Sequence, residues 1–106
     1  MLEQDKKDNN LIHDDEEINR LKDKVLKNND LSDLEFIELL LTYSTRARKN
    51  RKEIARKLLR TYGSVANILA TPTDELINVD SIDPETATLI SLVKACCLKI
   101  EWEYLE

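Results

Sequence analysis

The sequence predicts an all-α fold, a compact bundle of five or six helices. The chain of 106 residues holds only one glycine and two prolines, and it is rich in Leu, Ile, Lys, Glu and Asp. Apolar residues recur at helical spacing from residue 14 to residue 100, and no segment has the alternation of a strand. This length supports one hydrophobic core. We therefore expect one helical domain over residues 13–106, preceded by a flexible polar tail at residues 1–12.

The first two helices are predicted from their apolar spacing and from one cap. Ile18, Leu21 and Val25 fall on one side of a helix that starts near residue 14, and the polar residues 27–30 end it. Ser32 and Glu35 then have the spacing of a capping box, in which the side chain of each residue accepts a hydrogen bond from the backbone N–H of the other. The helix that follows, "DLEFIELLLTY", is apolar around most of its circumference, so we expect it to be the most buried element.

The next helix is two-sided and follows a basic connector, "STRARKN". Asn50 and Glu53 repeat the cap spacing, and Gly63 is a favourable left-handed stop. At about 100° per residue, one arc of this helix is apolar and the opposite arc is basic. The apolar arc holds Ile54, Ala55, Leu58, Leu59 and Tyr62, and the basic arc holds Lys52, Arg56, Lys57 and Arg60.

Three further helices complete the prediction. Ser64 opens a short one, Thr71 and Pro72 suit the N-cap and first residue of another, and Asp83 precedes the last, which starts at Pro84. The inner face of the last helix is predicted to carry Ala87, Ile90, Val93 and Cys97, extended by Leu89, Cys96 and Ile100. We expect at least one of the adjacent cysteines to pack as a small hydrophobic residue.

The charges are strongly segregated along the chain. Residues 46–60 carry eight basic residues against one acid, whereas residues 61–106 carry two against eight and residues 1–45 carry six against twelve. Such a basic segment favours non-specific contact with the phosphates of duplex DNA. The same segregation also suits a docking or dimerisation module that binds no nucleic acid, and both alternatives stay open. The candidate nucleic-acid-binding residues are Arg46, Arg48, Lys49, Arg51, Lys52, Arg56, Lys57 and Arg60.

Residues 72–100 have the pattern of a degenerate helix-hairpin-helix motif. In such a motif two glycines let the backbone approach a phosphate, which binds the N–H groups that open the second helix. Here Ser81 and Asp83 stand at the two glycine positions, on either side of Ile82. An aspartate there caps the helix itself and repels an anion. We expect Ile82 to be buried, Asp83 to be the cap, and the hairpin to be mainly architectural.

Three blocks resemble the N-terminal helical domain of the bacterial RadC-like family. They are "LSDLEFIELLLTY", "IARKLLRTYGSVANIL" and "TPTDELINVDSIDPETATLI", and the resemblance covers residues 18–100 or thereabouts. It implies a helix-hairpin-helix module in a family labelled as DNA repair. In that family the module precedes a JAB-type metallo-domain with an H-x-H metal site. His13 is the one histidine here, so this sequence holds no such metal site. We expect either that the metallo-domain has been removed from a longer protein or that this chain is a stand-alone relative of the family.

Composition argues against several other classes of protein. No apolar run approaches the roughly 20 residues that span a bilayer, and the N-terminus lacks the apolar core of a signal peptide, so we expect a cytoplasmic protein with reduced thiols. Cys96, Cys97 and His13 are too few and too poorly spaced for a zinc site. No nucleophile with a neighbouring base is recognisable either. We expect neither an enzyme nor a bound cofactor or small molecule.

Overall fold

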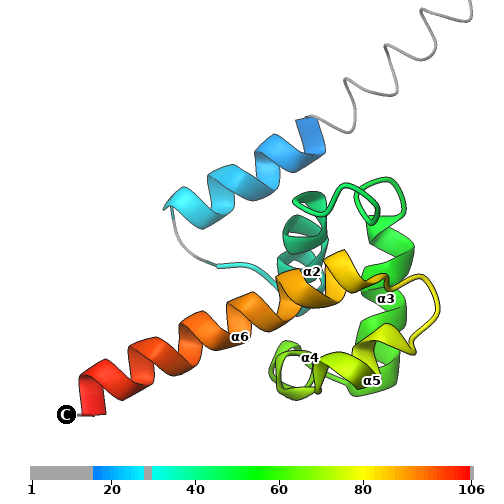
Figure 1. Cartoon of the computed structure of the whole chain (residues 1–106). Coiled ribbons are helices and arrows are strands. Elements are labelled where there is room, and N and C mark those ends of the chain that lie inside the picture. Colours follow the sequence, from blue (N-terminus) through cyan, green and yellow to red (C-terminus); the bar gives the residue numbers. More distant parts are fainter. Residues whose placement is uncertain (1–15, 28–29, 106) are drawn as a thin grey trace, which may run out of the picture.

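The computed structural model describes residues 16–27 and 30–105, and all the regular structure in these residues is helical (Figure 1). The predicted all-α fold is confirmed, while the predicted tail at residues 1–12 and His13 lie outside the described residues. Residues 16–27 are helical and are followed by five more helices. These are α2 (Asp33–Thr42), α3 (Arg51–Tyr62), α4 (Val65–Ala70), α5 (Thr73–Ile77) and α6 (Pro84–Leu105).

The start of α2 has the predicted capping box. The Ser32 hydroxyl accepts a hydrogen bond from the Glu35 N–H, and the Glu35 carboxylate accepts one from the Ser32 N–H, each at 3.2 Å. The hydrogen bond from the Ser32 N–H is the main reason why the pKa of Glu35 falls to about 2, and hydrogen bonding from Lys24 lowers this pKa further. Lys24 lies in the preceding helix, 3.1 Å from the carboxylate. The cap therefore also ties residues 16–27 to α2.

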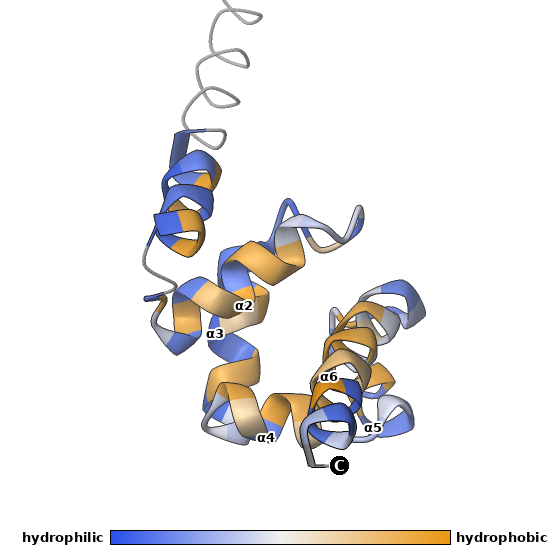
Figure 2. Ribbon diagram, turned by 90° about the vertical axis from the view of Figure 1, so that its left-hand side faces the viewer, coloured by the Kyte–Doolittle hydropathy of each residue, from blue (hydrophilic) through white to orange (hydrophobic). Residues whose placement is uncertain are grey.

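The core lies where α2, α3, α4 and α6 meet. Its fully enclosed side chains include Ile37, Leu41, Leu58, Ile68 and Ile90. Hydropathy follows this placement: α2 and α4 are mainly hydrophobic, whereas residues 16–27 are mainly hydrophilic with a hydrophobic strip (Figure 2). The strip holds the buried Ile18 and Leu21, as their spacing predicts.

Around the short helices α4 and α5, one helix boundary differs from the prediction, namely the start of α5. Gly63 has φ +93°, in the left-handed region that favours glycine, and the Ser64 hydroxyl caps α4 by accepting from the Asn67 N–H. The predicted cap for α5 is wrong by one residue, because Pro72 is the N-cap and Thr73 the first helical residue. The Thr71 hydroxyl instead donates to the Asn67 carbonyl oxygen at 2.7 Å, so it completes α4.

Helix α6 is much longer than the core that it covers. It has 22 residues and is therefore about 33 Å long, and its C-terminal half extends beyond α4 and α5 (Figure 1). The prediction that Cys96 and Cys97 pack against the core is wrong: both are exposed, as is Ile100. The inner face predicted from spacing is buried only as far as Ile90, because within the described residues nothing covers the helix beyond its middle.

Candidate nucleic-acid interface

The candidate basic residues lie in one stretch, from the turn after α2 to the end of α3. Arg46, Arg48 and Lys49 are exposed in the turn, and Lys52, Arg56 and Arg60 are exposed on α3. The Lys57 side chain is 38% exposed at the edge of this arc. On the opposite side of α3, Ile54, Ala55 and Leu58 are buried in the core. The amphipathic pattern of α3 therefore places its basic arc in solvent, as predicted.

Arg51 does not belong to this exposed surface, although the sequence places it among the candidates. It is 3% exposed, and its Nη1 donates to the Arg48 carbonyl oxygen at 3.0 Å. Its Nη2 lies 3.9 Å from a Glu17 carboxylate oxygen. The first residue of α3 thus faces the helix at residues 16–27. Only the packing of these two helices reveals this, because the helical wheel of α3 gives no sign of it.

Acidic side chains from distant segments pair with several of the remaining cations. Lys52 Nζ is 2.7 Å from Glu17, Lys57 Nζ is 3.5 Å from Asp80, and Arg46 Nε is 3.4 Å from Asp83. Lys57 also donates to the Asp80 carbonyl oxygen at 3.4 Å. Two of these acids belong to the hairpin between α5 and α6. The fold therefore brings the acidic hairpin against the basic segment.

The hairpin backbone turns through a serine. Ser81 has φ +74° and is the only residue other than glycine with positive φ among those described. This is the conformation for which a glycine is normally used. Ile82 follows and is 5% exposed, so its predicted burial is confirmed. Its N–H donates to the Val79 carbonyl oxygen at 3.1 Å, which closes the turn and directs the side chain into the core.

Asp83 caps α6, as predicted. Its Oδ1 accepts from the Thr86 N–H at 3.1 Å and also from the Thr86 hydroxyl. The hydroxyl bond is the largest reason why the pKa of Asp83 lies below its usual range. Thr86 is fully buried and shares a 2.7 Å hydrogen bond with Ser44, in the turn before the basic segment. Thr86 thus links the cap of α6 to the turn that follows α2.

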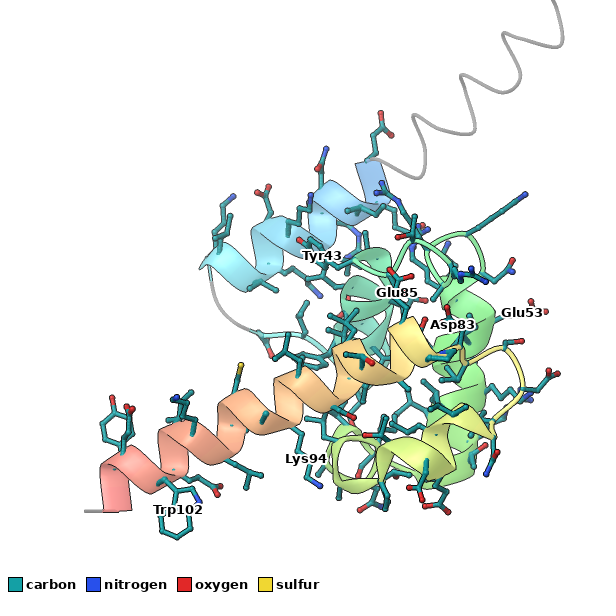
Figure 3. All side chains as sticks on the ribbon, viewed as in Figure 1. Tyr43, Glu53, Asp83, Glu85, Lys94 and Trp102 are labelled. Atoms are coloured by element: carbon teal, nitrogen blue, oxygen red, sulfur yellow. The ribbon has the colours of Figure 1, made fainter. Side chains whose placement is uncertain are left out.

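The hairpin and α3 border a groove of mixed charge. It is lined by Lys57 and Arg60 on one side and by Asp80 and Ser81 on the other, with Glu53 at its margin. Glu53 projects outward from α3 in Figure 3, whereas Asp83 lies at the start of α6. An anion in this groove meets Glu53 and Asp80 as well as Lys57 and Arg60. At the start of α6, the Thr86 N–H is already bonded to Asp83. Within the described part of the chain, Arg56 and Arg60 form no ion pair, so they are the clearest phosphate-contacting candidates.

Two further searches of the structure give negative findings. Among residues 16–27 and 30–105, no three metal-binding side chains gather closely enough to hold an ion. In the same residues, no helix has the length and apolar character needed to cross a membrane.

The sequence prediction overlooked Glu17 and Asp80 as partners of the basic segment. Their only signal was the overall charge segregation, which does not say which acid meets which cation.

Comparison with known proteins shows similarity to a UPF0758 protein. No protein-family model and no solved structure matches the chain. It is 32% identical over 76 residues to UPF0758 protein FN0909 of Fusobacterium nucleatum subsp. nucleatum. The matched segment covers 70% of this chain and 32% of that protein, so the chain spans about a third of the length of the relative it matches. The chain is thus similar, over most of its helical part, to one portion of a longer UPF0758 protein.

Proposed function

We propose that this chain is a non-catalytic helical module of a RadC-like protein, and that it binds duplex DNA non-specifically through its basic segment. The sequence blocks that resemble the RadC-like family and the similarity to a UPF0758 protein support the RadC-like assignment in the first part. The observation that carries the second part is the exposed basic arc of α3, continued by the cations of the preceding turn. The proposal places the protein in the cytoplasm, with access to DNA.

The acids that pair with the basic segment weaken this binding but do not prevent it. The Arg46 side chain is 76% exposed and Asp80 is 90% exposed, and ion pairs so open to water contribute at most about 1 kcal/mol each. Several phosphates spaced along a duplex can replace them, with release of counterions. No glycine-rich loop or cluster of aromatic side chains accompanies the cations, so we propose no reading of base sequence.

The hairpin, in this proposal, is a degenerate helix-hairpin-helix turn that supports the fold and does not grip phosphate. Asp83 holds the N–H group that a phosphate would use, and its carboxylate repels an anion. The exposed cations of the turn and of α3 therefore make the contact. The arrangement predicts binding dominated by charge and hence by salt concentration.

A titration of a labelled duplex tests this directly. We expect binding at low salt that weakens by about tenfold or more between 50 and 200 mM salt. The variant Arg56→Glu/Arg60→Glu should abolish it. A matched control, Lys27→Glu/Lys99→Glu, makes the same change in net charge at two exposed lysines outside the basic segment. Equal losses of DNA affinity in both variants would show that overall charge, and not the basic segment, causes the binding. Absence of binding by the unaltered chain would refute the DNA proposal.

The second candidate function is protein docking without nucleic acid. The observation that favours it is the apolar end of α6, where Leu92, Leu98, Ile100, Trp102 and Tyr104 are all exposed. A helix that is apolar around most of its circumference is normally covered. This surface is separate from the basic segment, so docking and DNA binding can be tested independently.

A further inference from the structure

The exposed half of α6 carries a regular apolar line that starts inside the core. Ile90, Val93, Cys97, Ile100 and Tyr104 follow one another at intervals of three, four, three and four residues. This is the spacing at which one helix packs along another. Ile90 is fully buried, Val93 is half-buried, and Ile100 and Tyr104 are 55% and 87% exposed. The line that anchors α6 to the core thus continues, uncovered, beyond it.

Trp102 lies on a different side of the helix. At about 100° per residue, Trp102 is separated from the centre of the apolar line by roughly 160° and Leu98 by roughly 120°. Figure 3 shows Trp102 projecting from the side of α6 that lies away from the helix at residues 16–27. The chain has a single tryptophan, so this residue can report which side of α6 becomes covered.

The charges of the exposed half are ordered along the helix. Lys94 and Lys99 come first, and Glu101 and Glu103 come after them. Lys94 and Glu101 both flank the apolar line on the same edge. A second helix of the same sequence in the same direction would place Lys94 and Glu101 beside uncharged residues of the second copy, Leu89 and Cys96. In the opposite direction, it would place each Lys94 beside a Glu101.

We propose that a second copy of this chain covers the exposed half of α6, in an antiparallel, two-fold symmetric helix pair. The register that brings the charges together sets Val93 opposite Tyr104 of the second copy and Cys97 opposite Ile100. Such an interface is isologous, since both copies use the same surface. It spans about three helical turns per copy. Stable interfaces bury roughly 1,200 Å² or more, so a weak, concentration-dependent dimer is expected.

Charge reversal tests the orientation. Lys94→Glu and Glu101→Lys should each weaken the dimer on the order of tenfold in sedimentation experiments, because each replaces two attractive contacts by repulsive ones. The double variant Lys94→Glu/Glu101→Lys should restore it, and an equimolar mixture of the two single variants should form the mixed dimer. Folding is monitored by helical circular dichroism. A merely structural role of either residue would give neither rescue.

Cross-linking tests the register. In a background with Cys96→Ser and Cys97→Ala, the double variant Val93→Cys/Tyr104→Cys should form a disulfide-linked dimer on mild oxidation. The two new thiols cannot join within one chain, because they lie about 16 Å apart along the helix and a disulfide tolerates less than about 7 Å. Val93→Cys alone should cross-link poorly, since its counterpart in the second copy lies at the far end of the pair. Leu98→Cys, on the other side of α6, is the matched control.

Several outcomes would overturn this inference. One is a chain that sediments as a monomer up to millimolar concentration. Another is preferential cross-linking through Leu98→Cys, or a blue shift of Trp102 fluorescence on association, which would place the contact on the other side of α6. The inference does not rest on DNA binding: Arg56→Glu/Arg60→Glu should leave dimerisation unchanged, so either proposal can fail alone.

Discussion

Asp83 should have opposite effects on stability and on DNA binding. Its Oδ1 caps α6 through Thr86, and its Oδ2 lies 3.4 Å from Arg46 Nε. Replacement by alanine removes the cap and the ion pair together. Replacement by asparagine keeps a cap acceptor and removes only the charge. The pair of variants therefore separates the two roles of this carboxylate.

The expected magnitudes follow from the exposure of each contact. Loss of a helix N-cap costs about 0.5–2 kcal/mol. The ion pair adds less than about 1 kcal/mol, because the Arg46 side chain is 76% exposed to solvent. We expect the free energy of unfolding to fall by about 1–2.5 kcal/mol for Asp83→Ala and by less than about 1 kcal/mol for Asp83→Asn. Removal of the acid frees Arg46 for phosphate, so both variants should bind DNA several-fold more tightly at low salt.

The effect of the charge should depend on pH. Because the folded-state pKa of Asp83 is lowered, its ionised form stabilises the fold at any pH above the ordinary carboxyl pKa of about 4. That contribution is lost as the pH falls through the lower, folded-state pKa. The difference in stability between the unaltered chain and Asp83→Asn should therefore shrink towards zero in acid. Asp83→Ala should keep part of its deficit there, since a protonated carboxyl still offers an acceptor to Thr86.

Denaturant unfolding beside a low-salt DNA titration gives both quantities. Glu85→Gln is a suitable control, since Glu85 is exposed in the first turn of the same helix and its charge is removed without loss of the Asp83 cap. Unchanged stability in Asp83→Ala would refute the capping role. Tighter DNA binding in Glu85→Gln and not in Asp83→Asn would show that the Asp83–Arg46 pair does not restrain the basic segment.

Further predictions concern the hairpin and the cap of α2. Ile82→Ala should lower the free energy of unfolding by roughly 2–5 kcal/mol in a denaturant melt, the usual cost of emptying a core site; a loss near zero would contradict the burial of Ile82. Ser81→Gly should stabilise the fold by up to about 1 kcal/mol, because it relieves the positive φ of a residue with a side chain. With Asp83→Gly added, stability should fall modestly while DNA affinity rises, and an unchanged affinity would mean that the hairpin does not face DNA. Glu35→Gln should weaken the protein at neutral pH and much less near pH 2, since the folded-state pKa of Glu35 is about 2; an equal loss at both pH values would argue against its charged contacts.

Local patterns in the sequence were enough to predict most of the helices and their ends. The capping box of Ser32 and Glu35, the stop at Gly63 and the cap at Asp83 depend on residues three or fewer positions apart. The burial of Ile54 and Leu58 follows from the period of one helix. Such features need no knowledge of the rest of the chain, because the backbone geometry of a helix fixes which residues share a face.

The candidate site depended on contacts that no local pattern records. Arg51 is a basic residue in a basic segment, yet it is buried because another helix packs over the start of α3 beside Glu17. Cys97 continues an apolar line, yet it is exposed because α6 extends beyond the elements that cover Ile90. The sequence determined which faces are basic or apolar. Only the tertiary structure decided which of them are covered, and by what, because covering a face depends on segments far away in the chain.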